Sequence, residues 1–425
     1  MCVRIAVLGG TSVGMPAFVR ALSRSVQEGG LPFLELRLFG RALVRAEGMI
    51  DYLKGRFVGV GRGSGDAIRL VGTSDLEAAM DGADIIVSQV RAGGMAGRDS
   101  DERLALSHGI PGDEGLGPSG LSAFLRGRSL TDELARAWSS IAPDAAFLQL
   151  TNPLGLTLER TARTSGLQPI GLCELPMTTS QSLRDAVRAE LGEITHAHYG
   201  LNHQAWLYDF SDATGRPCTD AVIEIADRSG LLPVDLDRIR SERAIPVNYL
   251  RLLYEPHDEL ARQQSRLRTR GMELSDWNRA LHKAYVRGDP ASHPVIDDLL
   301  ATRRMDWYDL MVVPTIAAII NGEPHEIVLN VSDRNIGVCT EGCCRLVGKT
   351  AMPLASPPLP NAPRSLFEKL IAYEYSALAL GDAPSRTDLA ETLNLHPLVD
   401  KEETAHAIAS DLFLLLSATQ HGERP

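Results

Sequence analysis

The sequence lacks an excess of positive charge, an apolar run of membrane-spanning length and a recognisable secretory signal. Its 43 basic and 54 acidic residues give a formal net charge of −11, which excludes the overall basic surface typical of proteins that bind nucleic acid or anionic membranes. The start MCVRIAVLGG does not have the order of charged, apolar and small residues found in secretory signals. We therefore expect a cytoplasmic protein that binds neither nucleic acid nor membrane.

Cysteine is also scarce. Six cysteines are spread over 425 residues, which is not a disulfide framework. Cys339, Cys343 and Cys344 lie close together in CTEGCC, but this spacing lacks the second ligand pair of a structural zinc site, so we expect surface-turn or core cysteines there. The hydrophobic (44%) and charged (23%) fractions are those of a globular protein, and the length allows two domains.

The N-terminal segment has the pattern of a dinucleotide-binding unit. An apolar run over residues 3–8 is followed directly by a glycine-rich turn and a helical pattern, a context in which backbone N–H groups bind a pyrophosphate. The turn comprises Gly9, Gly10, Thr11, Ser12 and Gly14. It departs from G-x-G-x-x-G because Thr11 stands where the second glycine would be, and any strand-to-helix turn also favours glycine.

The next predicted strand, residues 33–39, ends differently from its counterpart in NAD enzymes. There, an Asp or Glu binds the ribose hydroxyls, whereas Gly40 and Arg41 follow this strand. The change leaves room for a 2′-phosphate and supplies a guanidinium to pair with it. NADP is therefore an alternative to NAD, and a solvated surface role is the alternative for Arg41.

Two further strand ends carry polar loops. An apolar run at 83–90 leads into QVRAGGMAGR at 89–98, and a run at 146–150 ends in Thr151-Asn152-Pro153. Doubly wound sheets bind ligands at the carboxyl ends of their strands. The alternating strand and helix patterns predict an α/β protein, with a Rossmann-like parallel sheet at residues 1–194 and an α+β domain at residues 195–425.

An isolated cysteine and an isolated histidine follow in the stretch 171–206. Cys173 comes after a short apolar strand, and His203 lies thirty residues later in a second strand-like segment. A thiolate and an imidazole brought together from two strand ends would suit a divalent metal with open coordination positions. Either residue alone is more often a packing residue, so the metal site depends on the rest of the pattern.

Taken together, these segments resemble glycoside hydrolase family 4, the NAD- and divalent-metal-dependent 6-phospho-glycosidases and α-galactosidases, which are similar to malate and lactate dehydrogenases. The resemblance runs almost end to end, and the chain is identified as a divergent member. The matching segments are GGTS at 9–12, QVRAGGMAGR at 89–98, DE at 101–102, DEGLGPSG at 113–120, TNPLG at 151–155, GLCELP at 171–176, GLNHQAW at 200–206, PVNYLRLLY at 246–254, YDL at 308–310, IVLNVSDRNIG at 327–337 and HPLV at 396–399.

The resemblance implies a redox-neutral reaction on a sugar. NAD would oxidise C3 to a ketone, which acidifies the C2 proton, and a divalent metal, expected to be manganese, would stabilise the enediolate formed when a base removes that proton. The C1 group would leave, water would add, and the ketone would be reduced again. A 6-phospho-glycosidase is the first hypothesis. A sugar or nucleoside dehydratase or lyase that omits water addition, a simple NAD(P)-dependent dehydrogenase and a non-catalytic cofactor-binding protein are the alternatives.

The resemblance also assigns roles to residues of this sequence. The metal ligands would be Cys173 and His203, and the base would be Tyr249, with Tyr254 the weaker candidate. Because a phenol is a weak base, Arg251 or the metal would have to favour the phenolate. The acid would be Glu174, where relatives carry Asp or Asn.

Other residues would bind cofactor or sugar, with loop capping or ion pairing as the alternative for the sugar-binding set. The cofactor-binding residues would be Gly9, Gly10, Thr11, Ser12, Gly14, Arg41, Gln89, Arg91 and Asn152. The sugar-binding residues would be Arg98, Glu114, Asn152, Asn202 and Arg304, with Arg303 a further candidate for phosphate. A homodimer or homotetramer is implied.

Three departures from the family pattern point to a specialised member. Gly40 replaces the ribose-binding acid, Glu174 follows the metal cysteine, and CTEGCCRLVGKT stands where the family has a run ending in Val-Glu-Val-Pro. These departures put the substrate and the choice of nicotinamide cofactor in question.

Overall fold

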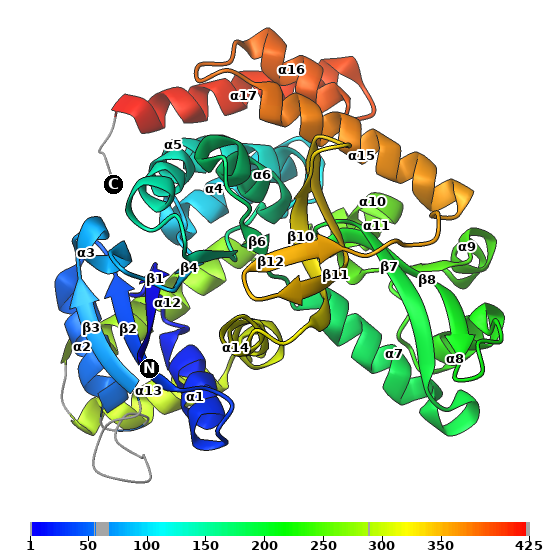
Figure 1. Ribbon diagram of the computed structural model, residues 1–425. Helices are drawn as coiled ribbons and strands as arrows, with labels where there is room; N and C mark the ends of the chain where they lie inside the picture. The colour runs from blue at the N-terminus through cyan, green and yellow to red at the C-terminus, as the bar shows by residue number, and fades with distance from the viewer. Residues whose placement is uncertain (1, 55, 57–67, 288–289, 422–425) are drawn as a thin grey trace.

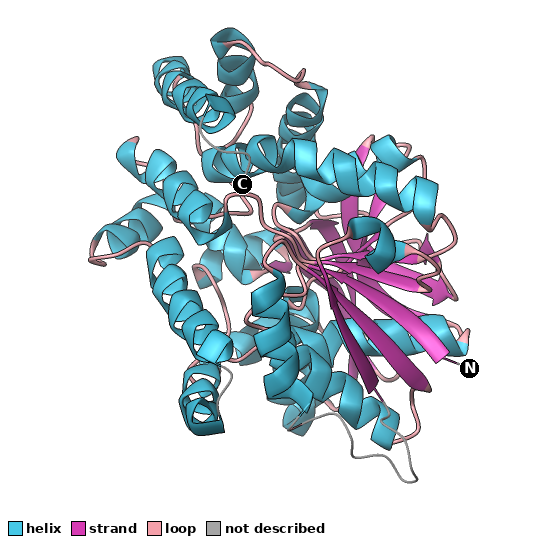
Figure 2. Cartoon of the chain, turned by 90° about the vertical axis from the view of Figure 1, so that its left-hand side faces the viewer, coloured by secondary structure: helices cyan, strands magenta, loops and turns pink. Residues whose placement is uncertain are grey.

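One twelve-stranded sheet with helices on both faces organises the chain (Figures 1 and 2). The computed structural model describes residues 2–54, 56, 68–287 and 290–421. The strand order is β3-β2-β1-β4-β5-β6-β10-β11-β7-β8-β9, with β12 paired to β11. The first six strands are parallel and the others pair antiparallel. The first six have the order of a dinucleotide-binding sheet, which confirms the predicted Rossmann-like fold.

The central parallel strands are buried on both faces. Every residue of β4 and of β5 is buried, as expected for a parallel sheet covered by helices on each side. The strands are β1 (Cys2–Leu8), β2 (Phe33–Phe39), β3 (Ile68–Thr73), β4 (Ile85–Ser88), β5 (Ala146–Gln149), β6 (Ile170–Gly171), β7 (Ile194–Leu201), β8 (Gln204–Asp212), β9 (Ala244–Pro246), β10 (His325–Asp333), β11 (Val338–Val347) and β12 (Thr350–Pro353).

The helices that follow the parallel strands begin close to the carboxyl edge of the sheet. Pro16, Pro118 and Pro176 occupy the first turns of α1, α5 and α7, where a missing N–H leaves no hydrogen bond unmade. The helices of this part are α1 (Met15–Gln27), α2 (Leu43–Lys54), α3 (Leu76–Met80), α4 (Gly94–Ser107), α5 (Gly117–Ile141), α6 (Leu154–Ser165) and α7 (Leu175–Leu191).

The later helices fall into two groups. Helix α12 packs on α2 and α4, and η3 and α14 pack on α1, whereas α15 and α17 lie over α4, α5 and α6 (Figure 1). They are α8 (Thr219–Arg228), α9 (Leu236–Glu242), η1 (Asn248–Leu250), α10 (Arg251–Tyr254), α11 (Pro256–Gln264), α12 (Arg270–Arg287), η2 (Pro290–Ser292), α13 (His293–Ala301), η3 (Tyr308–Val312), α14 (Val313–Asn321), α15 (Asn361–Ala379), α16 (Arg386–Asn394) and α17 (Glu402–His421).

The division into units 1–194 and 195–425 stays a prediction. The sheet continues from one unit into the other through the pairing of β6 with β10, and residues 270–321 supply helices that pack on the first unit. Among the described residues, no helix combines the length and the apolar character needed to cross a membrane.

The cysteine-rich segment lies inside the sheet. Cys339, Cys343 and Cys344 belong to β11, which pairs with β10, β7 and β12, and all three are free thiols. Cys339 and Cys344 are buried, so the core alternative holds for them. The segment also retains a glutamate, Glu341, at the centre of β11.

Candidate active site

A cavity of about 1650 Å³ is lined by loops at the carboxyl ends of the parallel strands and by the β7–β8 turn. The structure brings most of the predicted site residues to this one cavity. They are Gly9, Thr11, Ser12, Gly14, Arg41, Gln89, Arg91, Arg98, Glu114, Asn152, Cys173, Glu174, His203 and Tyr249. Gly10, Asn202 and Arg304 do not line it.

The glycine turn is fixed to the neighbouring strand. The N–H groups of Gly9 and Gly10 both donate to the carbonyl of Phe39, at 3.2 and 2.8 Å. A Cβ on Gly10 would come within 2.6 Å of the Cα of Leu38, so the position accepts only glycine. Gly10 therefore contributes to the cofactor end of the cavity through packing.

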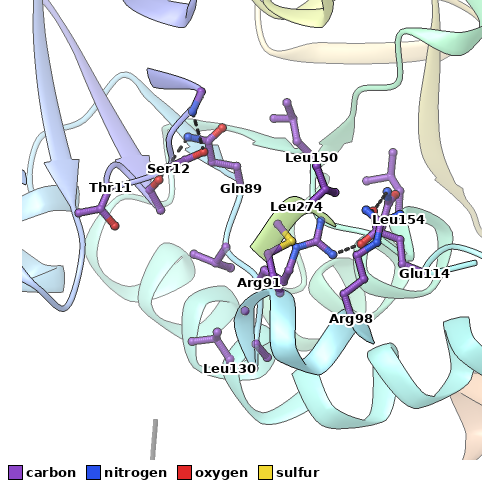
Figure 3. A pocket seen from close by; sticks show the side chains of 18 of the residues that line it. Thr11, Ser12, Gln89, Arg91, Arg98, Glu114, Leu130, Leu150, Leu154 and Leu274 are labelled. Carbon is purple, nitrogen blue, oxygen red and sulfur yellow. Dashed lines mark hydrogen bonds and ion pairs between the residues drawn. The ribbon is translucent and has the colours of Figure 1, made fainter. Parts of the chain in front are cut away.

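A carboxylate at the middle of the cavity holds two arginines. Glu114 pairs with Arg91 and, at 2.9 Å, with Arg98, and it accepts a hydrogen bond from Asn152 at 3.4 Å. Figure 3 shows Arg91 and Arg98 directed at Glu114, with Thr11 and Ser12 on another side of the pocket. The pairing fixes three predicted ligand-binding side chains relative to one another.

Cys173 lies in the loop between β6 and α7 and is 7% exposed. Burial raises the pKa of its thiol well above the usual range, and the carboxylates of Glu341 and Glu174 raise it further, while hydrogen bonds with Leu175 and Asn202 lower it. The thiolate therefore requires a nearby cation to form at neutral pH.

A buried polar network lies beside Cys173. Glu341 accepts hydrogen bonds from the side-chain amides of Asn202 at 3.1 Å and Asn330 at 3.0 Å, and it lies 3.0 Å from Nε2 of His198. All four side chains are at most 5% exposed. Asn202 thus links Glu341 to Cys173. Sequence reasoning missed Glu341, whose only signal is a carboxylate within a segment of small and apolar residues.

His203 is held in an unusual backbone conformation. Asn202 and His203 form the two-residue turn between β7 and β8, since Leu201 pairs with Gln204, and His203 has φ of 64°. This left-handed conformation costs a non-glycine residue roughly 1–3 kcal/mol. A histidine at such a position indicates that its side chain, and not the turn, determines the residue type.

The ring of His203 stacks on the ring of Tyr249, with centroids 4.2 Å apart and an angle of 5° between the planes. Strand β9, which pairs with β8, brings Tyr249 to this place. Nδ1 of His203 is buried without a hydrogen-bond partner in the described part of the chain. A Cβ on Gly115 would lie 2.9 Å from that nitrogen, so Gly115 makes room beside it.

Charges around Tyr249 oppose the formation of phenolate. The carboxylate of Asp113 and burial raise the pKa of Tyr249, Arg98 lowers it, and Cys173 and Glu174 raise it. Arg98 therefore takes the place expected for Arg251, which instead pairs with Glu259 at 2.9 Å.

The weaker candidate, Tyr254, lies outside the cavity. Its hydroxyl donates to Glu242 at 2.8 Å and accepts from the indole N–H of Trp206 at 3.0 Å. These two hydrogen bonds explain why a tyrosine stands at position 254 and give it a structural role.

Cys173 and His203 have the properties expected of metal ligands. One is a buried thiol next to two carboxylates, and the other has a buried nitrogen that lacks a partner among the described residues. No group of three or more His, Cys, Asp or Glu side chains in the described ranges is placed to hold a metal. A cation bound by these two side chains would retain positions for substrate oxygens.

Of the two neighbouring arginines considered for phosphate, only Arg303 lines the cavity. Burial lowers its pKa, Arg270 and Arg98 lower it further, and Glu174 raises it. The side chain of Arg304 is 90% exposed and lies 3.7 Å from Asp306. Both arginines lie in the irregular segment between α13 and η3. One side chain lines the cavity and the other is exposed, which the sequence pattern could not resolve.

Comparison with known proteins identifies the family. Residues 4–189 match the Family 4 glycosyl hydrolase domain, and residues 198–399 match the C-terminal domain of the same family. The chain belongs to glycosyl hydrolase family 4. This membership confirms the resemblance seen in the sequence and identifies the chain as a glycosidase-like enzyme.

Relatives within family 4 share the fold over the whole length. The 6-phospho-beta-glucosidase of Escherichia coli (strain K12) is 25% identical over 377 residues, covering 83% of this chain and 82% of the relative. The 6-phospho-beta glucosidase structure from Thermotoga maritima with NAD and glucose-6-phosphate has a TM-score of 0.84 at 21% identity, covering 99% of each chain. A 6-phospho-alpha-glucosidase from gut microorganisms, in complex with NAD and Mn²⁺, has a TM-score of 0.80 at 18% identity, covering 98% of each chain.

Proposed function

We propose that this family 4 enzyme cleaves a phosphorylated glycoside by a redox-neutral cycle of oxidation, elimination, water addition and reduction. The observation that carries the proposal is the stack of Tyr249 on His203 in the cavity that also contains Cys173, Glu174 and the glycine turn. This arrangement supports the proposal, because the candidate proton acceptor Tyr249, the candidate proton donor Glu174 and the two metal-ligand candidates line one cavity. The names of the relatives and the NAD and Mn²⁺ in the neighbouring structures support it.

The side chains of the cavity divide the proton transfers among them. Tyr249 is placed to accept the C2 proton, and Arg98 favours its phenolate form. Glu174 makes no side-chain hydrogen bond or ion pair within the described residues, so its carboxyl group is free to donate a proton to the leaving oxygen. A dinucleotide along the glycine turn would supply a reversible hydride acceptor, and a divalent cation at Cys173 and His203 would polarise the sugar oxygens.

A group of arginines supports a phosphorylated substrate. The pKa of Arg91 is lowered to about 10 by burial and by the charges of Arg98, Arg126 and Arg303, among others. Arg303 has no ion pair with another described residue and lies near Trp277 and Trp307, at 5.4 and 5.7 Å from their ring centroids. A phosphate dianion would offset this repulsion, and we assign it to Arg303.

Isotope labelling tests the reaction. The enzyme is incubated with manganese, NAD⁺ and an aryl 6-phospho-glucoside in deuterated water, for both anomers. We expect free sugar phosphate with deuterium at C2 and no net NADH. A product lighter by one water would instead assign a dehydratase or lyase, and NADH equal to the product formed would assign a dehydrogenase. The Cys173→Ser variant is the control, because it should remove metal-dependent turnover.

We also propose that the enzyme is a homodimer or homotetramer. Large apolar side chains are exposed on or next to the C-terminal helices, namely Tyr375, Leu395 and Leu414, which supports an interface there. Light scattering coupled to size exclusion tests this, and a monomer at micromolar concentration would exclude it.

A further inference from the structure

The missing acid at the end of β2 has a structural cause. A Cβ on Gly40 would lie 2.5 Å from Cγ2 and 3.0 Å from Oγ1 of Thr11. The N–H of Gly40 donates to the carbonyl of Thr73 at 3.1 Å, which fixes the glycine in this position. Thr11 therefore excludes every side chain at position 40, including the Asp or Glu that binds ribose hydroxyls in NAD enzymes. The two departures from the dinucleotide pattern, Thr11 in place of the second glycine and Gly40 in place of the acid, therefore result from a single packing contact.

Two arginines follow Gly40 on the same wall of the cavity. Arg41 and Arg45 both line it together with Thr11 and Ser12, both are exposed, and neither forms an ion pair with another described residue. By contrast, Arg37 in the middle of β2 pairs with Glu35 at 2.9 Å. The guanidinium groups beside Gly40 thus have no protein carboxylate to neutralise them within the described ranges.

The charge of Arg45 acts toward the cavity. Burial lowers the pKa of His282, which also lines the cavity, to about 4, and the charge of Arg45 contributes to this shift. None of the carboxylates that line the cavity belongs to β2 or to the turn between β2 and α2. This corner therefore offers two cations and, among the described cavity-lining residues of β2 and the β2–α2 turn, no carboxylate to bind ribose hydroxyls, which suits an anion.

We propose that the cofactor of this enzyme carries a 2′-phosphate, so that the chain uses NADP(H) in preference to NAD(H). Arg41 and Arg45 pair with the 2′-phosphate, and the Thr11–Gly40 contact removes the acid that would repel it. The proposal rests on the proposed function only in requiring that a dinucleotide binds in this cavity.

Binding measured without substrate tests the proposal. Dissociation constants of NADP⁺ and NAD⁺ are determined by calorimetry for the full-length enzyme, with 2′,5′-ADP and ADP as shorter probes. We expect NADP⁺ to bind at least about 10-fold more tightly than NAD⁺, because charge-assisted hydrogen bonds contribute that much or more. Equal or tighter binding of NAD⁺ would overturn the proposal and leave the glycosidase mechanism intact. Failure to bind either dinucleotide would overturn both.

Arginine variants test which side chains cause the preference for NADP⁺. Arg41→Ala combined with Arg45→Ala should remove the preference for NADP⁺ and leave the affinity for NAD⁺ within about twofold. Arg69→Ala is the control, since this exposed arginine on β3 pairs with Glu35 outside the cavity. Retention of the preference in the double variant would exclude Arg41 and Arg45 as its source.

Substitutions at position 40 provide an independent test of the cofactor preference. Gly40→Asp alone should weaken both cofactors because of the contact with Thr11, whereas Thr11→Gly with Gly40→Asp should bind NAD⁺ more tightly than NADP⁺. Melting temperatures of the apo variants separate misfolding from altered selection. If Gly40→Asp alone reversed the preference, the proposed coupling between Thr11 and Gly40 would be wrong.

Discussion

The two ends of the large cavity hold their side chains in opposite ways. At the reaction end, Cys173 and His203 are each 7% exposed, and Glu341 beside them is 1% exposed with three polar partners. At the cofactor end, Arg41 and Arg45 are exposed and have no ion pair with a described residue. The reaction end thus lies against a buried network of hydrogen bonds centred on Glu341, whereas the cofactor end presents exposed arginines that have no such network.

This difference has energetic consequences. In a buried network each polar group satisfies another, so that removing one leaves its neighbours unsatisfied in a medium of low dielectric constant. An exposed guanidinium interacts through water and salt, and its loss affects mainly the ligand that it binds. Substitutions at the reaction end should therefore change catalysis strongly, while substitutions of the exposed arginines at the cofactor end should change only which dinucleotide is held.

The largest effect is expected for Tyr249→Phe. Phenylalanine keeps the ring that stacks on His203 but cannot accept a proton, so kcat should fall by about 10²–10⁴-fold, and deuterium exchange at C2 should be lost with it. Dinucleotide affinity should stay unchanged, in contrast to the arginine variants at the other end. Exchange at the wild-type rate would assign the base to another group, for which Asp113 is a candidate because its carboxylate has the largest effect on the pKa of Tyr249.

An intermediate effect is expected for Glu341→Gln. The substitution weakens the orientation of Asn202 and so of the proposed cation site, and metal affinity should fall by about 10–100-fold. Manganese titration followed by electron paramagnetic resonance measures this directly. Glu326→Gln on the adjacent strand β10 is the matched control, since Glu326 is half exposed and pairs with Arg345. Unchanged manganese affinity in Glu341→Gln would show that the network only packs the sheet.

Much of the reaction end could be predicted from the sequence, because its residues lie in short segments at strand ends. Cys173, His203 and Tyr249 follow β6, β7 and β9. The doubly wound part of the sheet accounts for the position of Cys173, whereas the antiparallel pairing of β7, β8 and β9 brings Tyr249 next to His203. Arg303 was separated from Arg304 only by the structure, since a pattern does not give the direction of side chains in an irregular segment.

Other features depend on contacts between distant segments. Glu341 lies in β11, whose mixture of small, apolar and charged residues has no regular alternation, and strands β11 and β12 were not predicted. The contact of Thr11 with Gly40 joins the ends of β1 and β2. It explains two departures that look unrelated in the sequence. Such pairings are set by tertiary packing, which overrides local propensity.

The smallest effect on turnover is expected for Glu374→Gln. This variant tests whether a buried carboxylate outside the cavity affects catalysis. Glu374 in α15 is 5% exposed but does not line the cavity. Burial, followed by the charge of Glu159, raises its pKa to about 8 from 4.5. Oε2 of Glu374 has no hydrogen-bond partner among the described residues, whereas Glu159 pairs with Arg163 at 2.8 Å.

The pH dependence of stability follows from this shift. Because the folded-state pKa lies above the unfolded value, the folded state holds a proton that the unfolded state has lost between about pH 4.5 and 8. The free energy of unfolding should therefore fall as the pH rises through this window, by up to about 1.4 kcal/mol per pH unit. Glutamine carries no such charge, so urea unfolding at pH 6 and pH 8 should show a smaller fall for Glu374→Gln.

The kcat of Glu374→Gln should stay within about twofold of wild type. A large loss of turnover in Glu374→Gln would mean that burial alone, and not contact with the reaction end, determines how sensitive a residue is to substitution.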